Sequence, residues 1–174
     1  MPTLDPLRPL LDASLEGDDS ALAELVRRTQ PLVWRLCSAL GSAGEVEDLV
    51  QDVYARALAA LPTYRGEAPV VAWLISIARR VCADSVRRRQ HQRRLFSRLT
   101  ASAEATTTVR SDPIDDLLKV LDTDRRAAFV LTQLLGFSYE DAATALGCPI
   151  GTIRSRVARA RADLIGATRR AEAQ

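Results

Sequence analysis

Arginine and hydroxyl side chains cluster toward the C-terminal end of the chain, at a spacing that suits nucleic-acid binding by a helix. They are Thr152, Arg154, Ser155, Arg156, Arg159 and Arg161. The apolar residues of the same stretch recur at three- and four-residue steps: Ile153, Val157, Ala160 and Leu164. This period predicts a helix that buries the apolar residues and exposes the arginines. A guanidinium can donate two hydrogen bonds to a guanine edge, at about 1–3 kcal/mol of discrimination, and other arginines can bind phosphate.

The residues before this stretch predict that its helix is the second of a helix-turn-helix. Ser138 can cap a helix over 139–146, whose first backbone N–H groups need an acceptor. Gly147 can adopt the positive φ of a tight turn, and Pro149 suits the start of the following helix. A helix-turn-helix from Ser138 to about residue 164 would place its second helix in the major groove of duplex DNA.

Position on the second helix separates the basic residues into two groups. Ser155 and Arg159 lie opposite the buried stripe, so we expect them to reach base edges. Arg154, Arg156 and Arg161 flank that line and are expected to hold the phosphate backbone. The alternative interpretation is an arginine-rich helix that is merely solvated.

A second basic stretch occurs in the first half of the chain, after a loop that contains an aromatic residue. The loop is Tyr64-Arg65-Gly66-Glu67, and Asp84 is the one acidic residue among the arginines that follow. These are Arg79, Arg80, Arg87, Arg88, Arg89, Arg93, Arg94 and Arg98. Arginines track phosphates and an aromatic pocket can hold an unstacked base, so a groove here would favour single-stranded or opened DNA. Two alternatives stay open: Tyr64 packs on the helix, or the arginine run is a solvated helix end.

A third surface is acidic. On a helix predicted from about Gly44 to Leu61, the apolar residues face inward and the opposite side carries four polar residues. They are Glu45, Asp48, Gln51 and Asp52. Asp48 and Asp52 share a helical face, and isolated carboxylates four residues apart are more often exposed partner contacts than a two-metal site.

Residues typical of catalysis and metal binding are sparse. His91 is the single histidine, and Cys37, Cys82 and Cys148 are far apart, so no zinc-ligand spacing exists. No nucleophile lies beside a base in the sequence. We therefore expect no catalytic residue, no metal and no cofactor, and three reduced cysteines in the core of a cytoplasmic protein.

The net charge of +2 conceals a strong division along the chain. Residues 1–63 carry 10 acidic and 5 basic side chains, whereas residues 64–111 carry 3 acidic and 10 basic ones. Residues 112–146 are again acidic, with 7 against 3, and residues 147–174 are basic, with 2 against 6. Two basic blocks on an acidic chain indicate two polyanion contacts. Attraction between the acidic first helices and the basic last helix would favour packing of the two halves.

Helical periodicity dominates, and the chain is predicted to be all-α, with two small domains at 1–98 and 113–174 joined by a linker at 99–112. The first domain has a short helix after Pro6, a helix from Asp18–Ser20 to Gly41, the 44–61 helix, and a long helix whose first turn contains Pro69. The second contains about four helices. The linker has neither apolar period nor bulk. No apolar run approaches the roughly 18 residues that span a bilayer, so no membrane insertion is expected.

Three blocks carry a resemblance to a known family. EDLVQDVY at 47–54, WLISIAR at 73–79 and PIGTIRSR at 149–156, with LLGFSYEDAA at 134–143, resemble bacterial extracytoplasmic-function (group IV) sigma factors of the sigma-70 family. The blocks occur in the family's order and spacing. Among actinobacterial members the chain is most similar to the sigma-C type.

The resemblance implies a role for each surface. Asp48, Gln51 and Asp52 match the block that binds the β′ coiled-coil of core RNA polymerase. The loop at 64–68 matches the loop that captures a flipped base of the −10 element, and the linker matches a segment that threads toward the polymerase channels. The helix that contacts the melted −10 strand is matched by Arg79, Arg80, Asp84, Arg87 and Arg88. The helix that reads the −35 element is matched by Thr152, Arg154, Ser155, Arg156 and Arg159.

The implied partners are the β′ and β subunits of core RNA polymerase and promoter DNA, with an anti-sigma factor as a common further partner in the family. Arg80 stands where many members have asparagine, and Tyr64 where many have phenylalanine, so the family's −10 base preference is not carried over.

Two other classes of function are weighed against a promoter-recognition subunit. A stand-alone helix-turn-helix regulator would use its first domain to bind a ligand or to dimerise, but the arginine groove and the lack of an apolar pocket signature disfavour it. A DNA enzyme with a recognition tail lacks clustered carboxylates and a nucleophile.

Overall fold

The computed structural model describes residues 5–41, 44–99 and 117–172, apart from the side chains of residues 93, 96–99 and 172. Across these ranges every regular element is helical and no strand occurs, as the sequence predicts. The predicted linker, 99–112, lies outside the described residues except for the backbone of residue 99, and so does the predicted start of the second domain at Pro113.

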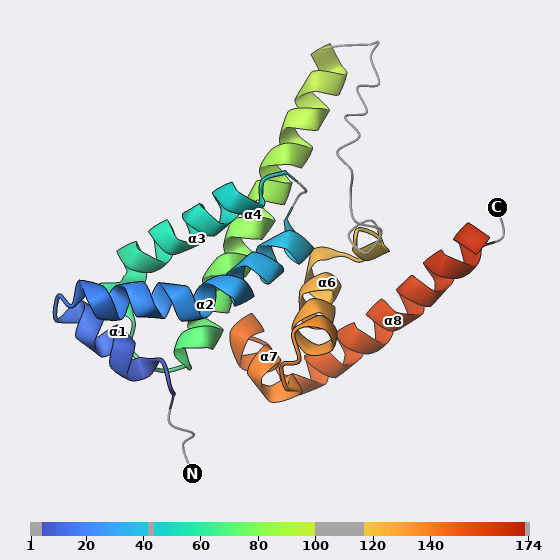
Figure 1. Ribbon diagram of the computed structural model, residues 1–174. Coiled ribbons are helices and arrows are strands. Elements are labelled where there is room, and N and C mark those ends of the chain that lie inside the picture. Colours follow the sequence, from blue (N-terminus) through green and yellow to red (C-terminus); the bar gives the residue numbers. More distant parts are fainter. Residues whose placement is uncertain (1–4, 42–43, 100–116, 173–174) are drawn as a thin grey trace.

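The first group of helices includes one long helix, part of which projects beyond the others (Figure 1). It comprises α1 (Arg8–Leu15), α2 (Asp19–Leu40), α3 (Val46–Ala60), the 3₁₀ turn η1 (Leu61–Thr63) and α4 (Val70–Leu99). The Asp18 carboxylate caps α2 by accepting hydrogen bonds from the backbone N–H of Ser20 at 2.8 Å and of Ala21 at 3.1 Å. Gly41 ends α2, as predicted, and a side chain there would collide with Leu49 of α3. A local cap therefore sets the start of α2, and close packing against α3 leaves room only for glycine at its end.

Val70, Trp73, Leu74, Ile77 and Val81 recur at three- and four-residue steps, which predicts one buried stripe on α4, but the helix is buried over a wider arc. Val70, Leu74, Ile77 and Val81 are buried as expected, whereas Trp73 is half-buried. Further buried positions are Ala72, Ile75, Ala78 and Cys82. The additional burial has a tertiary cause, because α4 packs on α2 and α3 and also on α7 from the second half of the chain.

The second group of helices contains the predicted helix-turn-helix. It comprises α6 (Thr123–Phe129), the π-helical turn η2 (Val130–Leu134), α7 (Tyr139–Leu146) and α8 (Ile150–Glu172). Ser138 caps α7, since its hydroxyl accepts a hydrogen bond from the backbone N–H of Asp141 at 3.0 Å. Gly147 follows α7 with a φ of 62°, the left-handed conformation that a glycine adopts without strain. The turn chemistry inferred from the sequence is confirmed.

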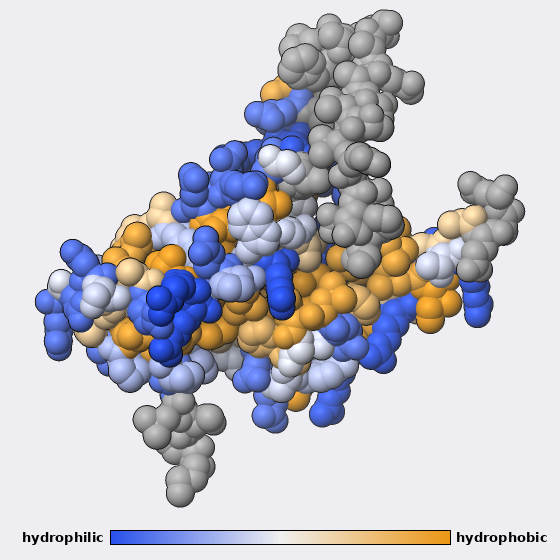
Figure 2. Space-filling view, in the orientation of Figure 1, coloured by the Kyte–Doolittle hydropathy of each residue, from blue (hydrophilic) through white to orange (hydrophobic). Residues whose placement is uncertain are grey.

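One apolar core joins the two groups. Val53 of α3, Ile75 of α4, Leu131 of η2 and Ile153 of α8 are each at most 2% exposed and belong to one cluster. Figure 2 shows apolar side chains continuing across the middle of one face toward α8. The sequence predicts that the two halves pack through attraction between the acidic first helices and the basic last helix. The main contact between the halves is of another kind. The principal contact is α7 against α4, and it is mostly apolar.

Two of the three cysteines are buried as predicted. Cys37 and Cys82 are at most 1% exposed, whereas Cys148 lies half-buried at the turn between α7 and α8. Within the described ranges, no helix is both long and apolar enough to cross a membrane.

Replacing Ser138 with alanine should destabilise the helix-turn-helix, because the first turn of α7 loses its capping acceptor. We expect the free energy of unfolding to fall by about 1 kcal/mol in urea titrations followed by circular dichroism. Thr144→Ala is the matched control, since Thr144 is an exposed hydroxyl residue on the same helix whose loss should change stability by less than about 0.5 kcal/mol. Equal losses in the two variants would contradict the capping role.

Candidate nucleic-acid and polymerase surfaces

The loop that follows η1 borders a hollow beside the start of α4. The hollow has a volume of about 270 Å³ and is open to solvent. Its lining comprises Thr63, Tyr64, Arg65, Glu67, Ala68, Ala72, Trp73 and Ser76, with Thr144 from α7. Polar groups and two aromatic rings therefore surround a space large enough for a nucleobase. Gly66 has a φ of 74°, which a side-chain-bearing residue adopts only with strain.

Tyr64 packs on α4, which was one of the two alternatives left open by the sequence. Its ring centroid lies 5.0 Å from that of Trp73 at an interplanar angle of 47°, and its hydroxyl donates a hydrogen bond to the Ala68 carbonyl. Burial raises the pKa of the Tyr64 phenol above its ordinary value. Tyr64 packs against Trp73 and at the same time lines the hollow. The ring is thus held in place before any ligand arrives.

The arginines of α4 do not all gather near Tyr64. Arg80, Arg87 and Arg88 are exposed, and Arg79 is half-buried. A straight helix rises about 1.5 Å per residue, so Arg87 lies about 21 Å along α4 from Trp73. The structure therefore places Arg79 and Arg80 nearest the loop and distributes the others along the projecting half of α4 (Figure 1). The described arginine side chains of α4 are therefore not gathered into a single compact groove.

Asp84 has a structural role within this basic helix. Its carboxylate accepts hydrogen bonds from Arg87 at 2.5 Å and from Arg56 of α3 at 3.0 Å. Both guanidinium groups lower the pKa of the Asp84 carboxyl, and the hydrogen bond from Arg87 has the larger effect. Asp84 thereby connects α3 to α4, and its negative charge offsets part of the basic surface.

The acidic surface of α3 is exposed as predicted for three of its four members. Asp48, Gln51 and Asp52 are exposed, but Glu45 is turned toward α4. Glu45 accepts hydrogen bonds from Arg89 at 2.5 Å and from Ser85 at 3.1 Å. The adjacent helix α2 exposes 39% of Trp34, which sequence reasoning did not single out. The sequence could have indicated this residue, because Trp34 does not fall on the three- and four-residue spacing of the buried residues of α2. Exposed tryptophans often anchor protein interfaces.

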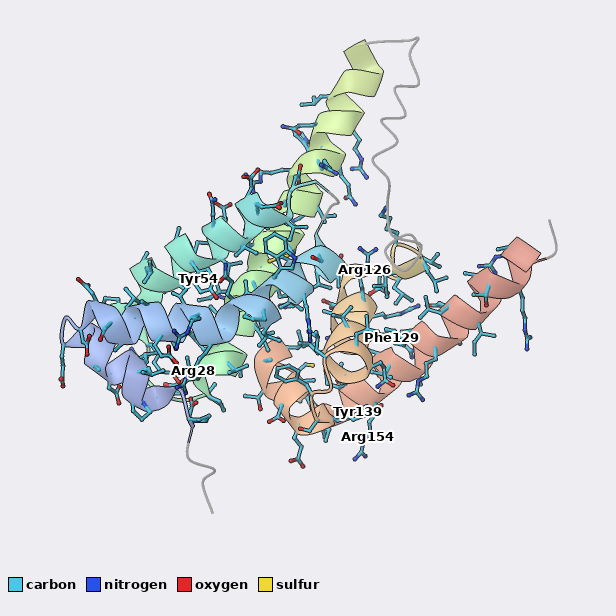
Figure 3. All side chains as sticks on the ribbon, in the orientation of Figure 1. Arg28, Tyr54, Arg126, Phe129, Tyr139 and Arg154 are labelled. Carbon is cyan, nitrogen blue, oxygen red and sulfur yellow. The ribbon has the colours of Figure 1, made fainter. Side chains whose placement is uncertain are left out.

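The outer face of α8 carries most of the residues expected to meet DNA. Arg154, Ser155, Arg159 and Arg161 are exposed, and Figure 3 shows Arg154 pointing away from the other helices. Arg161 donates to the Gln133 side-chain oxygen of η2 at 2.5 Å. Thr152 is half-buried.

Arg156 differs from its expected placement. Its guanidinium turns inward and donates a hydrogen bond to Asp124 of α6 at 2.5 Å, with Cys148 Sγ at 3.6 Å from its other terminal nitrogen. Ile153 and Val157 lie on the side of α8 that packs against α6. Arg156 is at the edge of that side, so its guanidinium can reach the Asp124 carboxylate of α6 instead of extending into solvent.

Asp124 connects the two halves of the chain. Its carboxylate accepts from Arg156 through one oxygen and from Arg79 of α4 through the other, at 3.3 Å. Arg79 Nε is buried and has no hydrogen-bond partner among the described residues. One carboxylate thus holds an arginine from each of the two predicted DNA-contacting helices. Sequence reasoning missed Asp124, and the acidic composition of residues 112–146 was the available signal.

Around these surfaces, the described residues contain no group of three or more histidine, cysteine or acidic side chains able to hold a metal ion.

Two protein-family models match the chain. Residues 25–92 match the model described as Sigma-70 region 2, and residues 111–164 match the model described as Sigma-70, region 4. The first match includes the acidic surface of α3, the loop and most of α4, and the second includes the helix-turn-helix.

Curated proteins and solved structures give the same association. The chain is 39% identical over 163 residues to a probable RNA polymerase sigma-C factor of Mycobacterium bovis, covering 88% of this chain and 86% of the relative. It is 31% identical to the ECF RNA polymerase sigma-E factor of Escherichia coli K12, covering 87% and 88%. CnrH in complex with the cytosolic domain of CnrY matches with a TM-score of 0.72 and 28% identity, covering 92% and 96%. RpoE bound to the anti-sigma factor NepR from Bartonella quintana matches with a TM-score of 0.66 and 31% identity, covering 82% and 93%.

Reversing the charge of Asp124 should weaken the packing of the two halves of the chain and raise the fraction of molecules in which they are apart. Asp124→Arg removes two ion pairs and places a third guanidinium beside Arg79 and Arg156, which should weaken the α4–α7 packing by about 1–2 kcal/mol. We expect the radius of gyration from small-angle X-ray scattering to increase.

Asp163→Arg is the matched control. Asp163 is similarly exposed and pairs with Arg125 at 2.6 Å, but this pair joins α6 to α8 within one half. Its reversal should lower stability without changing the radius of gyration. The same scattering curve for both variants would contradict the role of Asp124.

Proposed function

The chain belongs to the extracytoplasmic-function group of the sigma-70 family, and on this premise we propose which of its surfaces carries out each step of promoter recognition. As a sigma factor it directs core RNA polymerase to promoters for transcription initiation and catalyses no reaction of its own. The observation that carries the conclusion is the presence of both sigma-70 regions, in order, on one chain. We divide the chain into a region 2 domain at 1–98, a linker at 99–112 and a region 4 domain at 113–174.

Asp48, Gln51 and Asp52 form the surface that binds the β′ subunit of core RNA polymerase. Their exposure on one helix supports this role, because acidic and amide groups there can pair with basic residues of a partner without first breaking contacts within the chain. Glu45 is excluded from this surface, since its carboxylate is engaged by Arg89 and Ser85 of α4.

The hollow beside Tyr64 is the site that captures an unstacked base of the −10 element. A captured base must be surrounded by stacking groups and hydrogen-bonding groups, and both line the hollow. Arg65 and Gly66 belong to the same loop, and Arg79 and Arg80 are the first arginines along α4 after it. Arg87 and Arg88 lie farther along α4 and would contact phosphates of the opened strand, with Asp84 holding Arg87 in place.

The outer face of α8 binds the −35 element as a duplex. Ser155 and Arg159 are placed to reach base edges, and Arg154 and Arg161 to reach phosphates on either side. Thr152 lies at the start of the helix, where hydroxyls and backbone N–H groups can bind phosphate. Arg156 is proposed to bind phosphate as well, and it must first leave Asp124.

The protein is proposed to work in the cytoplasm alongside core polymerase, contacting its β′ and β subunits. One of the similar structures is the sigma factor RpoE in complex with the anti-sigma factor NepR. This supports an anti-sigma factor as a further partner of the present chain.

Transcription reconstituted from purified core polymerase tests the function directly. A library of genomic fragments is transcribed with and without the protein, and initiation sites are mapped on the RNA. Initiation at a defined set of promoters that depends on the added protein is expected. Unchanged transcription together with tight duplex binding by the isolated protein would support a stand-alone helix-turn-helix regulator instead.

Charge reversal at Asp52 should weaken polymerase binding and leave DNA recognition unchanged. We expect Asp52→Arg to reduce the affinity for core polymerase at least about tenfold in fluorescence anisotropy, because like charges across an interface repel. Binding of the isolated protein to a −35 duplex should be unaltered. Glu16→Arg makes the same charge change at an exposed residue after α1 and serves as the control; a comparable loss there would argue against a specific surface.

Truncating Arg159 should remove discrimination between −35 sequences. Arg159→Ala is expected to reduce the preference for the selected −35 sequence over a substituted one by about 5- to 150-fold, corresponding to the loss of one bidentate base contact. Competitive binding to short duplexes measures this ratio. Arg169→Ala removes an exposed arginine from the last turn of α8 and should weaken binding to both duplexes equally. An unchanged preference in Arg159→Ala would show that Arg159 contacts phosphate.

A further inference from the structure

Helix α1 lies outside the residues that match sigma-70 region 2, yet it packs beside the loop of the proposed −10 site. The region 2 match begins at residue 25, whereas α1 spans Arg8–Leu15. Leu7 and Leu11 form a small apolar cluster with Leu25, Leu61 and Val70, and both aromatic rings beside the hollow pack against it. The N-terminal segment is thus part of the structure that supports the loop.

Asp5 caps the helix that follows the loop. Its Oδ2 accepts a hydrogen bond from the backbone N–H of Val70 at 2.6 Å, across 65 positions of sequence, while its Oδ1 accepts from Leu7 N–H at 3.1 Å. Val70 is the first residue of α4, whose first turn contains no acidic residue of its own. A carboxylate at this position satisfies an unpaired backbone donor and interacts favourably with the positive end of the helix.

Arg8 holds the loop from one side. Its guanidinium carbon lies 5.4 Å from the centroid of the Tyr64 ring, a cation–π distance. Asp12, one turn later on α1, fixes the guanidinium by accepting from Nε with both carboxylate oxygens, at 2.8 and 3.0 Å. The same group lies over Gly66, where any side chain would collide with its Nη1. The backbone conformation requires a glycine at this position, and a side chain here would also displace the end of the Arg8 side chain.

We propose that Asp5 and Arg8 are positioning residues of the −10 site, which set the conformation of the 64–68 loop for capture of an unstacked base. Both act through other groups: Arg8 through the Tyr64 ring and Asp5 through the first turn of α4. A loop already held in its binding conformation loses less conformational entropy on binding, so its affinity for the base is higher. The inference rests on the proposed function of the hollow and extends the −10 site to a helix outside region 2.

The test measures base capture separately from the other contacts. The full-length protein is assembled with core polymerase on a promoter selected from random sequence by the wild-type holoenzyme, with 2-aminopurine at successive −10 positions of the opened strand. Fluorescence at the captured position reports unstacking. Affinity for core polymerase, affinity for a −35 duplex and the thermal midpoint are measured in parallel, since these would change if α1 merely stabilised the fold.

Arg8→Ala is expected to reduce base capture about two- to fivefold, as the loss of a partly exposed cation–π contact predicts. The three parallel measurements should stay at their wild-type values, and Arg8→Lys should restore part of the capture by retaining the cation. Arg28→Ala is the matched control, because Arg28 is a similarly exposed arginine in an i,i+4 pair with Glu24, at 53% against 43% side-chain exposure. Asp5→Asn should have a smaller effect than Asp5→Ala, because the amide oxygen can still accept from Val70.

A double-mutant cycle tests whether Arg8 acts through the Tyr64 ring. Arg8→Ala should have no further effect on capture in a Tyr64→Leu background, whereas its effect should persist with Tyr64→Phe, which keeps the ring. Loss of capture in Arg8→Ala no greater than in Arg28→Ala, or accompanied by equal losses in all the parallel measurements, would overturn the proposal. If the wild-type holoenzyme starts transcription but unstacks no −10 base, the assignment of the hollow itself is wrong, and the proposal is overturned with it.

Discussion

Burial of α4 on two sides is the constraint on which the rest of the structure depends. Helices α2 and α3 cover one side and α7 covers another, so Ile75, Ala78 and Val81 are at most 2% exposed. Full burial of one valine or isoleucine side chain contributes about 1.5–3 kcal/mol, whereas a surface ion pair contributes about 0–1 kcal/mol. Arginines can emerge only on the arc that remains, and the loop before α4 is held where that helix begins.

Within this apolar framework, ion pairs determine how the helices are oriented more than how strongly they are held together. Asp124 receives Arg79 and Arg156 at a partly exposed site, where each ion pair contributes little. The pairs nevertheless orient the Asp124 side of α6 toward Arg79 of α4 and Arg156 of α8. The same arginines are proposed to bind nucleic acid, so DNA binding exchanges a carboxylate of the chain for phosphates of the promoter. Such an exchange is feasible because partly exposed ion pairs are weak enough to be replaced.

The proposed −10 site shows how a short recognition loop is stabilised from outside its own region of sequence. The loop has few residues to bury and cannot form a core of its own. Its conformation depends on contacts with Trp73 of α4 and with Asp5 and Arg8 before and within α1. A change in the N-terminal segment can therefore alter base capture without altering any residue that lines the hollow.

The sequence by itself determined the helices, the caps of α2 and α7 and the exposed faces of α3 and α8, because these depend on residues within a few positions of one another. Asp18, Ser138 and Gly147 act as local stop and start signals, and the exposed faces of α3 and α8 follow from a period of 3.6 residues. Only the tertiary structure decided that the two halves share one core, that Arg156 turns inward to Asp124, and that Asp5 caps a helix 65 residues away. These features depend on which faces meet in space, and a helical period specifies that a face is apolar without specifying what covers it.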